Sequence, residues 1–245
     1  MQNKKQLTLE LAYLYPRLLN IYGDRGNILA LRYRCNARGI NLNVTTIEIG
    51  ENIQGDKFDI YFIGGGQDQQ QQLVAGDLLQ KKSVIISAID SDAVFLAICG
   101  GYQLLGKYYR TKDGNELKGI EAVDIYTLAG EKRMIGNVIC KLLDSGERIV
   151  GFENHSGKTY FGSGVKPLAK VIQGSGNNGE DGYEGIRHKN VFGTYLHGSL
   201  LPKNPYLTDE IILLALERKG LRLPELIIDD AIENIAHKKA EKISY

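Results

Sequence analysis

The sequence predicts an α/β protein in which a mostly parallel sheet is covered on both faces by helices and extended by a β-rich region. In the first half, strand-like and helix-like segments alternate, which is typical of parallel strands joined by helical crossovers. In the second half, glycines and polar turns separate short β-like pieces with little helical periodicity. No linker, low-complexity tract or internal repeat interrupts the 245 residues, so we expect one domain over 1–245.

The first half supplies most of the expected parallel sheet. Strands are expected at residues 6–11, 42–49, 58–63 and 93–98, and helical segments at 27–38 and 67–89. Gly39 is a suitable stop for the first helix. In parallel sheets covered by helices, ligands bind at the carboxyl ends of the strands. The two glycine-rich strand ends, 64–66 and 99–101, should therefore face the same crevice.

The second half is expected to be rich in short strands and to return to the parallel sheet near its end. Short β-like pieces are expected over 117–190, followed by a strand over 191–196. That strand would deliver His197 to the same carboxyl edge of the sheet as the glycine-rich ends. Two helices, over 206–219 and 226–239, complete the expected elements.

Composition and charge exclude several classes of protein. The formal net charge is +1, which gives no reason to expect nucleic acid or an anionic membrane as the main partner. We see no apolar stretch long enough for membrane insertion and no signal-peptide core, and three scattered cysteines fit a reducing cytoplasm. No metal-ligand spacing or Walker A motif is present, so we expect neither a metal nor a cofactor.

Cys99 is the most informative residue, because a thiol stands at a sharp turn between a buried strand and a helix. It follows the apolar run 93–98 and is followed at once by Gly100 and Gly101. The helix N-terminus would favour the thiolate, and the glycines would leave room for a substrate. A buried structural cysteine is the alternative, and we assign that role to Cys35 and Cys140.

His197 is the strongest candidate for a base. A cysteine and a histidine at one sheet edge are the minimum for thiol-based acyl transfer, in which the imidazole accepts the thiol proton and later protonates the leaving group. An exposed loop histidine is the alternative interpretation. His155 lies in a polar turn that could be structural or line the site, and His188 and His237 lie in charged surroundings.

Three further segments carry weaker signals. The turn at Gly64–Gly66 could direct backbone N–H groups at an oxyanion, or serve only as a strand-to-helix turn. Residues 174–179 match G-x-G-x-x-G without the helix that a dinucleotide site needs, so we expect a flexible hairpin or surface loop. Arg133 could bind a carboxylate, although its spacing alone indicates a charged turn residue.

Together these segments resemble the class I, triad-type glutamine amidotransferases, in their cobyric-acid-synthase-like branch. The resemblance rests on Gly64-Gly-Gly-Gln-Asp68, on Ala97-Ile-Cys-Gly-Gly-Tyr-Gln103 and on the strand-borne His197. It covers nearly the whole chain. Within the branch, the chain is most similar to the free-standing glutaminase subunits of lipid II isoglutaminyl synthases, through residues 14–27, 133–136 and 151–157.

The resemblance implies a flavodoxin-like three-layer sandwich and the hydrolysis of L-glutamine through a cysteine thioester. Cys99 would be the nucleophile and His197 the general acid and base. Backbone amides near Gly65 or Gly66 and at Gly100 would hold the oxyanion. Two further side chains would contact the substrate glutamine: Gln103, and Arg133 at its α-carboxylate.

The resemblance also implies a partner. Ammonia would pass to a Mur-ligase-like subunit, MurT, in a heterodimer. That subunit would use ATP to amidate D-glutamate in the stem peptide of lipid II, an acceptor attached to the membrane, during peptidoglycan biosynthesis. Two rival functions stay open: a glutaminase for another, cobyrinate-type synthetase, and a non-catalytic or regulatory member of the fold in which Cys99 is a redox-sensitive or structural thiol.

One position departs from the pattern of this family. Many members carry a glutamate two residues after the histidine, where this chain has Ser199, and no acidic residue follows His197 until Asp209. A serine cannot stabilise an imidazolium as a carboxylate does. We therefore expect an incomplete triad within this chain, poor glutaminase activity alone, and an acidic residue supplied by the synthetase partner.

Overall fold

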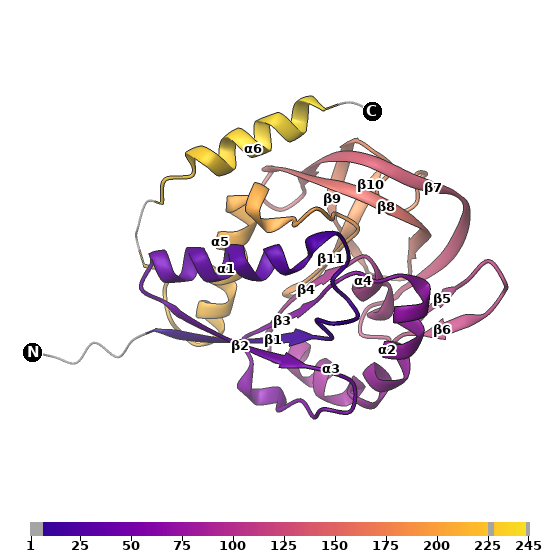
Figure 1. Ribbon diagram of the computed structural model, residues 1–245, viewed down its shortest axis with the longest axis horizontal. Helices are drawn as coiled ribbons and strands as arrows, with labels where there is room; N and C mark the ends of the chain where they lie inside the picture. Colours follow the sequence, from indigo (N-terminus) through magenta and orange to yellow (C-terminus); the bar gives the residue numbers. More distant parts are fainter. Residues whose placement is uncertain (1–6, 225–227, 244–245) are drawn as a thin grey trace, which may run out of the picture.

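A computed structural model describes residues 7–224 and 228–243, in which one mixed sheet of eleven strands runs through both halves of the chain (Figure 1). The strand order is β2-β1-β3-β4-β11-β10-β9-β7-β5-β6, with β8 paired to β7. The α/β class with an added β region is confirmed. That residues 1–245 form one domain stays a prediction.

Five strands form the parallel part of the sheet, in the order β2-β1-β3-β4-β11, which is the strand order of flavodoxin-like folds. All residues of β3, β4 and β11 are buried, as expected for strands covered on both faces. The bounds are β1 Thr8–Leu14, β2 Asn41–Ile47, β3 Ile60–Ile63, β4 Val94–Ile98 and β11 Val191–Thr194.

Helices cover both faces of this parallel part, with α1 and α5 on one side and α2 and α3 on the other (Figure 1). The expected helix over 67–89 is two helices, because the helical path ends at Gln80 and starts again at Lys82. The helices are α1 Arg25–Ala37, α2 Asp68–Gln80, α3 Lys82–Asp90, α4 Gly100–Leu104, α5 Pro205–Arg218 and α6 Ala231–Lys242. Short 3-10 turns occur at η1 Ile21–Gly23, η2 Gly55–Lys57 and η3 Leu201–Lys203.

The β-rich region differs from the short pieces expected over 117–190. Its centre is a long antiparallel hairpin of β7, with 18 residues, and β8, with 14. Glycines and polar side chains within both strands weaken the period-2 pattern, and therefore the sequence suggested shorter strands. The strands are β5 Tyr108–Arg110, β6 Glu116–Lys118, β7 Ile125–Leu142, β8 Arg148–Phe161, β9 Lys166–Gln173 and β10 Tyr183–His188.

Two expected boundaries near the end of the chain also change. Strand β11 ends at Thr194, and the next two residues continue without strand pairing to His197, which forms an isolated antiparallel bridge with Phe152. In the expected helix 226–239, residues 226–227 lie outside the described residues, and α6 begins only at Ala231. None of the helices described here combines the length and apolarity that a bilayer crossing requires.

Candidate active site

Cys99 lies at the turn that the sequence predicts, between β4 and α4. Its backbone has φ 48° and ψ −105°, a conformation that residues with a side chain rarely adopt. Two backbone hydrogen bonds hold it, from Cys99 N to Thr194 O at 2.8 Å and from Gln103 N to Cys99 O at 2.9 Å. Strain of this kind costs of order 1–3 kcal/mol and is concentrated at functional sites.

Gly65 lies where Cys99 and His197 approach each other. A Cβ atom at Gly65 would lie 2.6 Å from Cε1 of His197 and 3.2 Å from Cβ of Cys99. Gly101 is constrained in the same way, since its Cβ would lie 2.8 Å from the carbonyl oxygens of Ile63 and Gly64. The glycines on both strand ends therefore let the thiol, the imidazole and the β3 backbone meet.

His197 is completely buried and is held in a polar environment. Its Nδ1 atom lies 3.3 Å from Oδ1 of Asp24, and its Nε2 atom has no hydrogen-bond partner among the described residues. Burial lowers the pKa of the imidazole, but the negative charge of Cys99 and the carboxylate of Asp24 outweigh it and raise that pKa to about 10. The site thus favours an imidazolium beside the sulfur.

Asp24 is the residue that sequence reasoning missed. It is completely buried at the start of α1, and its second oxygen, Oδ2, accepts a hydrogen bond from Gly65 N at 2.7 Å. The expectation that no acid of this chain faces His197 is therefore wrong. A signal was present, because Asp24 follows the first parallel strand, whose carboxyl end lies at the same sheet edge as Cys99.

The hydrogen bond from Gly65 N to Asp24 changes which of the expected backbone amides can hold an oxyanion. The amide of Gly65 points at Asp24 and is not available to a substrate oxygen. Within the residues the structure describes, the amide of Gly66 has no acceptor, and Gly66 lines the cleft. Gly100 is the first residue of α4, and a Cβ there would lie 2.9 Å from Cδ of Gln71.

Ser199, which occupies the position of the expected glutamate, connects the histidine loop to the loop that carries Asp24. Its Oγ donates a hydrogen bond to Gly23 O at 2.6 Å. A Cβ atom at Gly26 would lie only 2.1 Å from Oγ of Ser199, so the start of α1 packs directly on Ser199. This contact holds together the two segments that bear Asp24 and His197.

A cleft of about 350 Å³ opens beside the thiol. This volume is at the low end of the range of roughly 300–1,000 Å³ for small-molecule sites. Three of the side chains expected at the site, Cys99, Gln103 and Arg133, line it together with Gly66. The other lining residues are Ile21, Tyr22, Gln67, Asp68, Gln69, Gln71, Tyr109, Asn154, His155, Ser156 and Gly157.

Arg133 reaches this cleft from a bulge in β7, where the register with β8 shifts between Ala129 and Met134. Its Nε donates to Oδ1 of Asn154 at 2.5 Å, and Nδ2 of Asn154 donates to the hydroxyl of Tyr22 at 2.6 Å. The ring of Tyr22 meets the His197 ring edge-on, with 5.0 Å between centroids. Two hydrogen bonds and one ring contact, through Asn154 and Tyr22, therefore connect Arg133 to the ring of His197.

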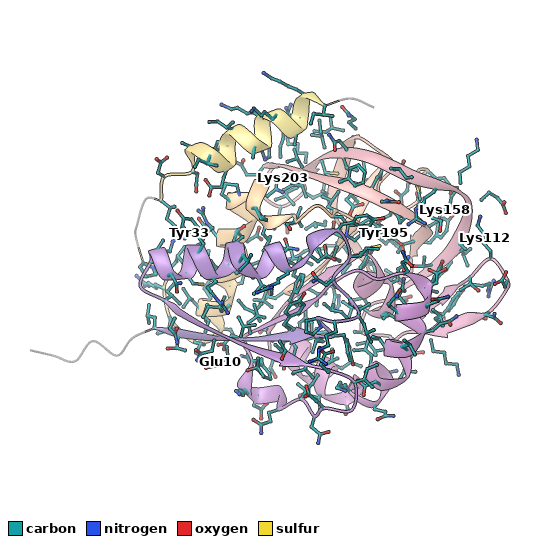
Figure 2. All side chains as sticks on the ribbon, in the orientation of Figure 1. Glu10, Tyr33, Lys112, Lys158, Tyr195 and Lys203 are labelled. Atoms are coloured by element: carbon teal, nitrogen blue, oxygen red, sulfur yellow. The ribbon has the colours of Figure 1, made fainter. Side chains whose placement is uncertain are left out.

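Gln103 and His155 form the deeper wall, around the completely buried ring of Tyr195, which Figure 2 labels in the interior of the molecule. Nε2 of Gln103 donates to the Tyr195 hydroxyl at 3.0 Å, and that hydroxyl lies 2.6 Å from Oγ1 of Thr159. The His155 ring stacks on Tyr195 with 3.6 Å between centroids. The polar turn expected at His155 is instead part of β8 and lines the cleft.

The remaining candidates lie outside the cleft. Burial raises the pKa of Cys35 to about 12 and that of Cys140 well above its ordinary value, so both stay neutral thiols. The loop over 174–179 is packed rather than merely superficial, since Asn177 and Asn178 are buried. No group of three or more histidine, cysteine or acidic residues suited to a metal ion occurs in the described parts of the chain.

Comparison with known proteins defines the class to which this fold and site belong. The sequence profile of the CobB/CobQ-like glutamine amidotransferase domain matches residues 10–205, and the chain belongs to this family. Two solved glutamine amidotransferases share the fold, both with a TM-score of 0.56. One, from Thermotoga maritima, is 15% identical over 95% of this chain and 93% of its own, and the other is 12% identical over 83% and 98%.

Individual relatives show more specifically than the family profile what the chain is similar to. The chain is 46% identical to the lipid II isoglutaminyl synthase (glutamine-hydrolyzing) subunit GatD of Staphylococcus aureus, over 88% of this chain and 87% of the relative. It is 42% identical to GatD of Streptococcus pneumoniae, over 86% and 82%. A probable cobyric acid synthase of Methanococcus maripaludis is 31% identical over 81% of this chain but only 40% of its own length.

Proposed function

We propose that this chain is a glutamine-hydrolysing subunit that releases ammonia from the side-chain amide of L-glutamine. The observation that carries the proposal is the convergence of Cys99, His197 and Asp24 beside a small polar cleft. A nucleophile, a base and an acid that orients the base are the recurring components of acyl-transfer sites. The described residues supply all three from one chain.

The reaction follows from this geometry. The Cys99 thiolate attacks the γ-carbonyl carbon, the resulting oxyanion is held by the amide of Gly66 with a further contribution from Gly100, and the C–N bond breaks as the His197 imidazolium protonates the leaving ammonia. Water, deprotonated by His197, then attacks the thioester, which releases glutamate and restores the thiol. Asp24 keeps Nδ1 protonated, so that Nε2 faces the sulfur and the leaving group.

Substrate recognition is assigned to the cleft walls. A guanidinium binds a carboxylate through charge-assisted hydrogen bonds, and Arg133 at the mouth of the cleft is suited to the α-carboxylate of glutamine. Gln103, one helical turn beyond Cys99, contacts the substrate from the deeper wall. That both side chains line the same cleft as Cys99 supports this assignment.

The destination of the ammonia is the finer part of the proposal. The 46% and 42% identity to GatD subunits, over most of each chain, supports a role in lipid II isoglutaminyl synthase and hence in peptidoglycan biosynthesis. The partner would be a Mur-ligase-like, MurT-type subunit that activates the α-carboxylate of D-glutamate with ATP, and the complex would act in the cytoplasm. A cobyrinate-type synthetase is the second candidate, supported by the 31% identical relative.

The proposal is tested by glutamate production from glutamine, measured for the purified chain with and without a MurT-type subunit. We expect partner-supported hydrolysis that Cys99→Ala reduces by at least ~10³-fold and that His197→Ala reduces nearly as much. Amidation of lipid II, and none of cobyrinate, is the expected fate of the ammonia. Normal hydrolysis by Cys99→Ala would exclude the thiol as nucleophile.

A further inference from the structure

His155 has a ring whose contacts are complete except at one nitrogen. The side chain is 3% exposed, its ring lies flat on Tyr195 at an interplanar angle of 6°, and its Nδ1 atom lies 2.7 Å from the carbonyl oxygen of Gly157. Its Nε2 atom is buried, has no hydrogen-bond partner among the described residues, and belongs to a residue that lines the cleft. A buried polar atom of this kind is normally satisfied by a ligand group or by water.

The contact with Gly157 fixes which proton the imidazole carries. A carbonyl oxygen only accepts hydrogen bonds, so Nδ1 must donate, and in the neutral ring Nε2 is left as an acceptor. Oε2 of Glu153 lies 3.9 Å from Nε2, too far for a hydrogen bond, and accepts instead from Gly176 N at 3.0 Å. The lone pair of Nε2 is therefore unused by the described residues, on a side chain that lines the cleft, and the carboxylate of Glu153 lies nearby.

Gln103 supplies a second unused acceptor on the same wall. Its Nε2 donates to the Tyr195 hydroxyl, and its Oε1 is buried without a hydrogen-bond partner in the described parts of the chain. The His155 ring stacks on Tyr195 and the Gln103 amide is hydrogen-bonded to the Tyr195 hydroxyl, so one buried side chain positions both acceptors. Two acceptors, one of them near the carboxylate of Glu153, are suited to a group that carries positive charge and several N–H donors.

We infer that His155 is a substrate-binding residue, and that its Nε2 and Oε1 of Gln103 accept hydrogen bonds from the α-ammonium group of glutamine. This inference rests on the proposed function and names a specificity determinant within the same cleft. The α-ammonium and α-carboxylate are carried by one carbon, so a cation and a set of acceptors must line the same cleft, as Arg133 and the two acceptors do. The site thereby selects free α-amino acids over amides that lack the amino group.

Binding is the direct test, because it separates this role from catalysis. In the complex with the partner subunit and in a Cys99→Ala background, calorimetry compares glutamine with 4-carbamoylbutanoate, which is glutamine without its α-amino group. We expect the analogue to bind about 10- to 100-fold more weakly than glutamine, the effect of one or two lost hydrogen bonds to a charged group. Equal affinity for the two compounds overturns the inference whatever the behaviour of any variant.

The variant His155→Phe keeps the stacking on Tyr195 and removes the acceptor. We expect it to weaken glutamine binding about 10- to 100-fold, to change the affinity of 4-carbamoylbutanoate less than about 3-fold, and to raise KM more than it lowers kcat in the Cys99 enzyme. His188→Phe, in β10 and outside the cleft, is the matched control and should bind both compounds normally.

The outcomes separate this inference from the proposed function. Equal weakening of both compounds by His155→Phe, or loss of kcat with unchanged KM, overturns the inference while glutamine hydrolysis stands. A wild-type complex that neither binds nor hydrolyses glutamine overturns both.

Discussion

At the scale of single residues, His197 is oriented by a group that is distant from it in the sequence. Asp24 and His197 are 173 positions apart, yet their side chains meet behind the thiol. Nothing in the spacing of residues near His197 reveals this contact. The family pattern predicts an acid in the segment after His197, whereas Asp24 lies in the loop that follows the first parallel strand. Cys99 could be found from sequence because strand, turn and helix are contiguous.

Asp24→Asn should shift the pH dependence of glutamine hydrolysis. The charge of Asp24 raises the pKa of His197, so its removal lowers that pKa, although the Cys99 contribution remains. The imidazolium that protonates ammonia is then lost at lower pH, and the alkaline limb of the kcat profile should move to lower pH. We also expect kcat to fall by roughly 10²-fold or more, because the imidazole loses its orientation. An alkaline limb and a kcat that stay in place would show that Asp24 does not act on His197.

Gly65→Ala should inactivate the enzyme without unfolding it. The new Cβ would lie 2.6 Å from His197, so the imidazole must move, and displacement of a catalytic group by about 1 Å can cost ~10²-fold in rate. Gly76→Ala is the control, since a Cβ there has nothing within 4 Å and lies in α2. Turnover and thermal unfolding of both variants check this, and a fully active Gly65→Ala enzyme would contradict the close approach.

At the scale of elements, sequence patterns located the parallel half better than the β-rich half. Apolar runs with glycines at or just beyond their ends mark β3 and β4 clearly, because strands buried on both faces are continuously apolar. The long hairpin β7–β8 carries glycines and exposed polar residues, so its strands were expected to be shorter. His155 was consequently assigned to a turn, and the depth of its burial could not be foreseen from its neighbours.

Arg133→Ala should weaken glutamine binding more than it changes the fold. The β7 bulge brings the guanidinium to the cleft, and loss of a carboxylate contact in a partly buried site costs roughly 2–4 kcal/mol. We therefore expect KM to rise by about 10²-fold, measured by initial rates of glutamate formation. Arg148→Ala, in which an exposed ion pair with Glu241 is lost, is the matched control and should leave KM unchanged. Unchanged kinetics in Arg133→Ala would remove this residue from the site.

At the scale of the whole molecule, we expect the chain to be a poor glutaminase without its partner. The reason is not a missing acid, because Asp24 lies beside His197. At the mouth of the cleft, Tyr22 and Arg133 are exposed, and the half-buried Asn154 joins them by hydrogen bonds, so a docked subunit would contact this group directly. Ammonia released without an activated acceptor is also lost to solvent.

The comparison is glutamate production by the isolated chain and by the assembled complex at saturating glutamine. We expect stimulation of at least about 10-fold on assembly, a modest fraction of what closure of a site can supply. Asp24→Asn in both preparations shows whether an acid of the partner replaces it, in which case the complex would retain activity. An isolated chain that is as active as the complex would refute partner dependence.

The central claim is that Cys99 becomes covalently bonded to the γ-carbonyl of glutamine. The most direct measurement is acid quenching of the complex during turnover, followed by peptide mass spectrometry of all three cysteines. We predict a γ-glutamyl thioester on the peptide that contains Cys99, none on Cys35 or Cys140, and neither adduct nor turnover in Cys99→Ala. Glutamine hydrolysis that persists in Cys99→Ala, or an adduct on another residue of the wild-type enzyme, would contradict the account.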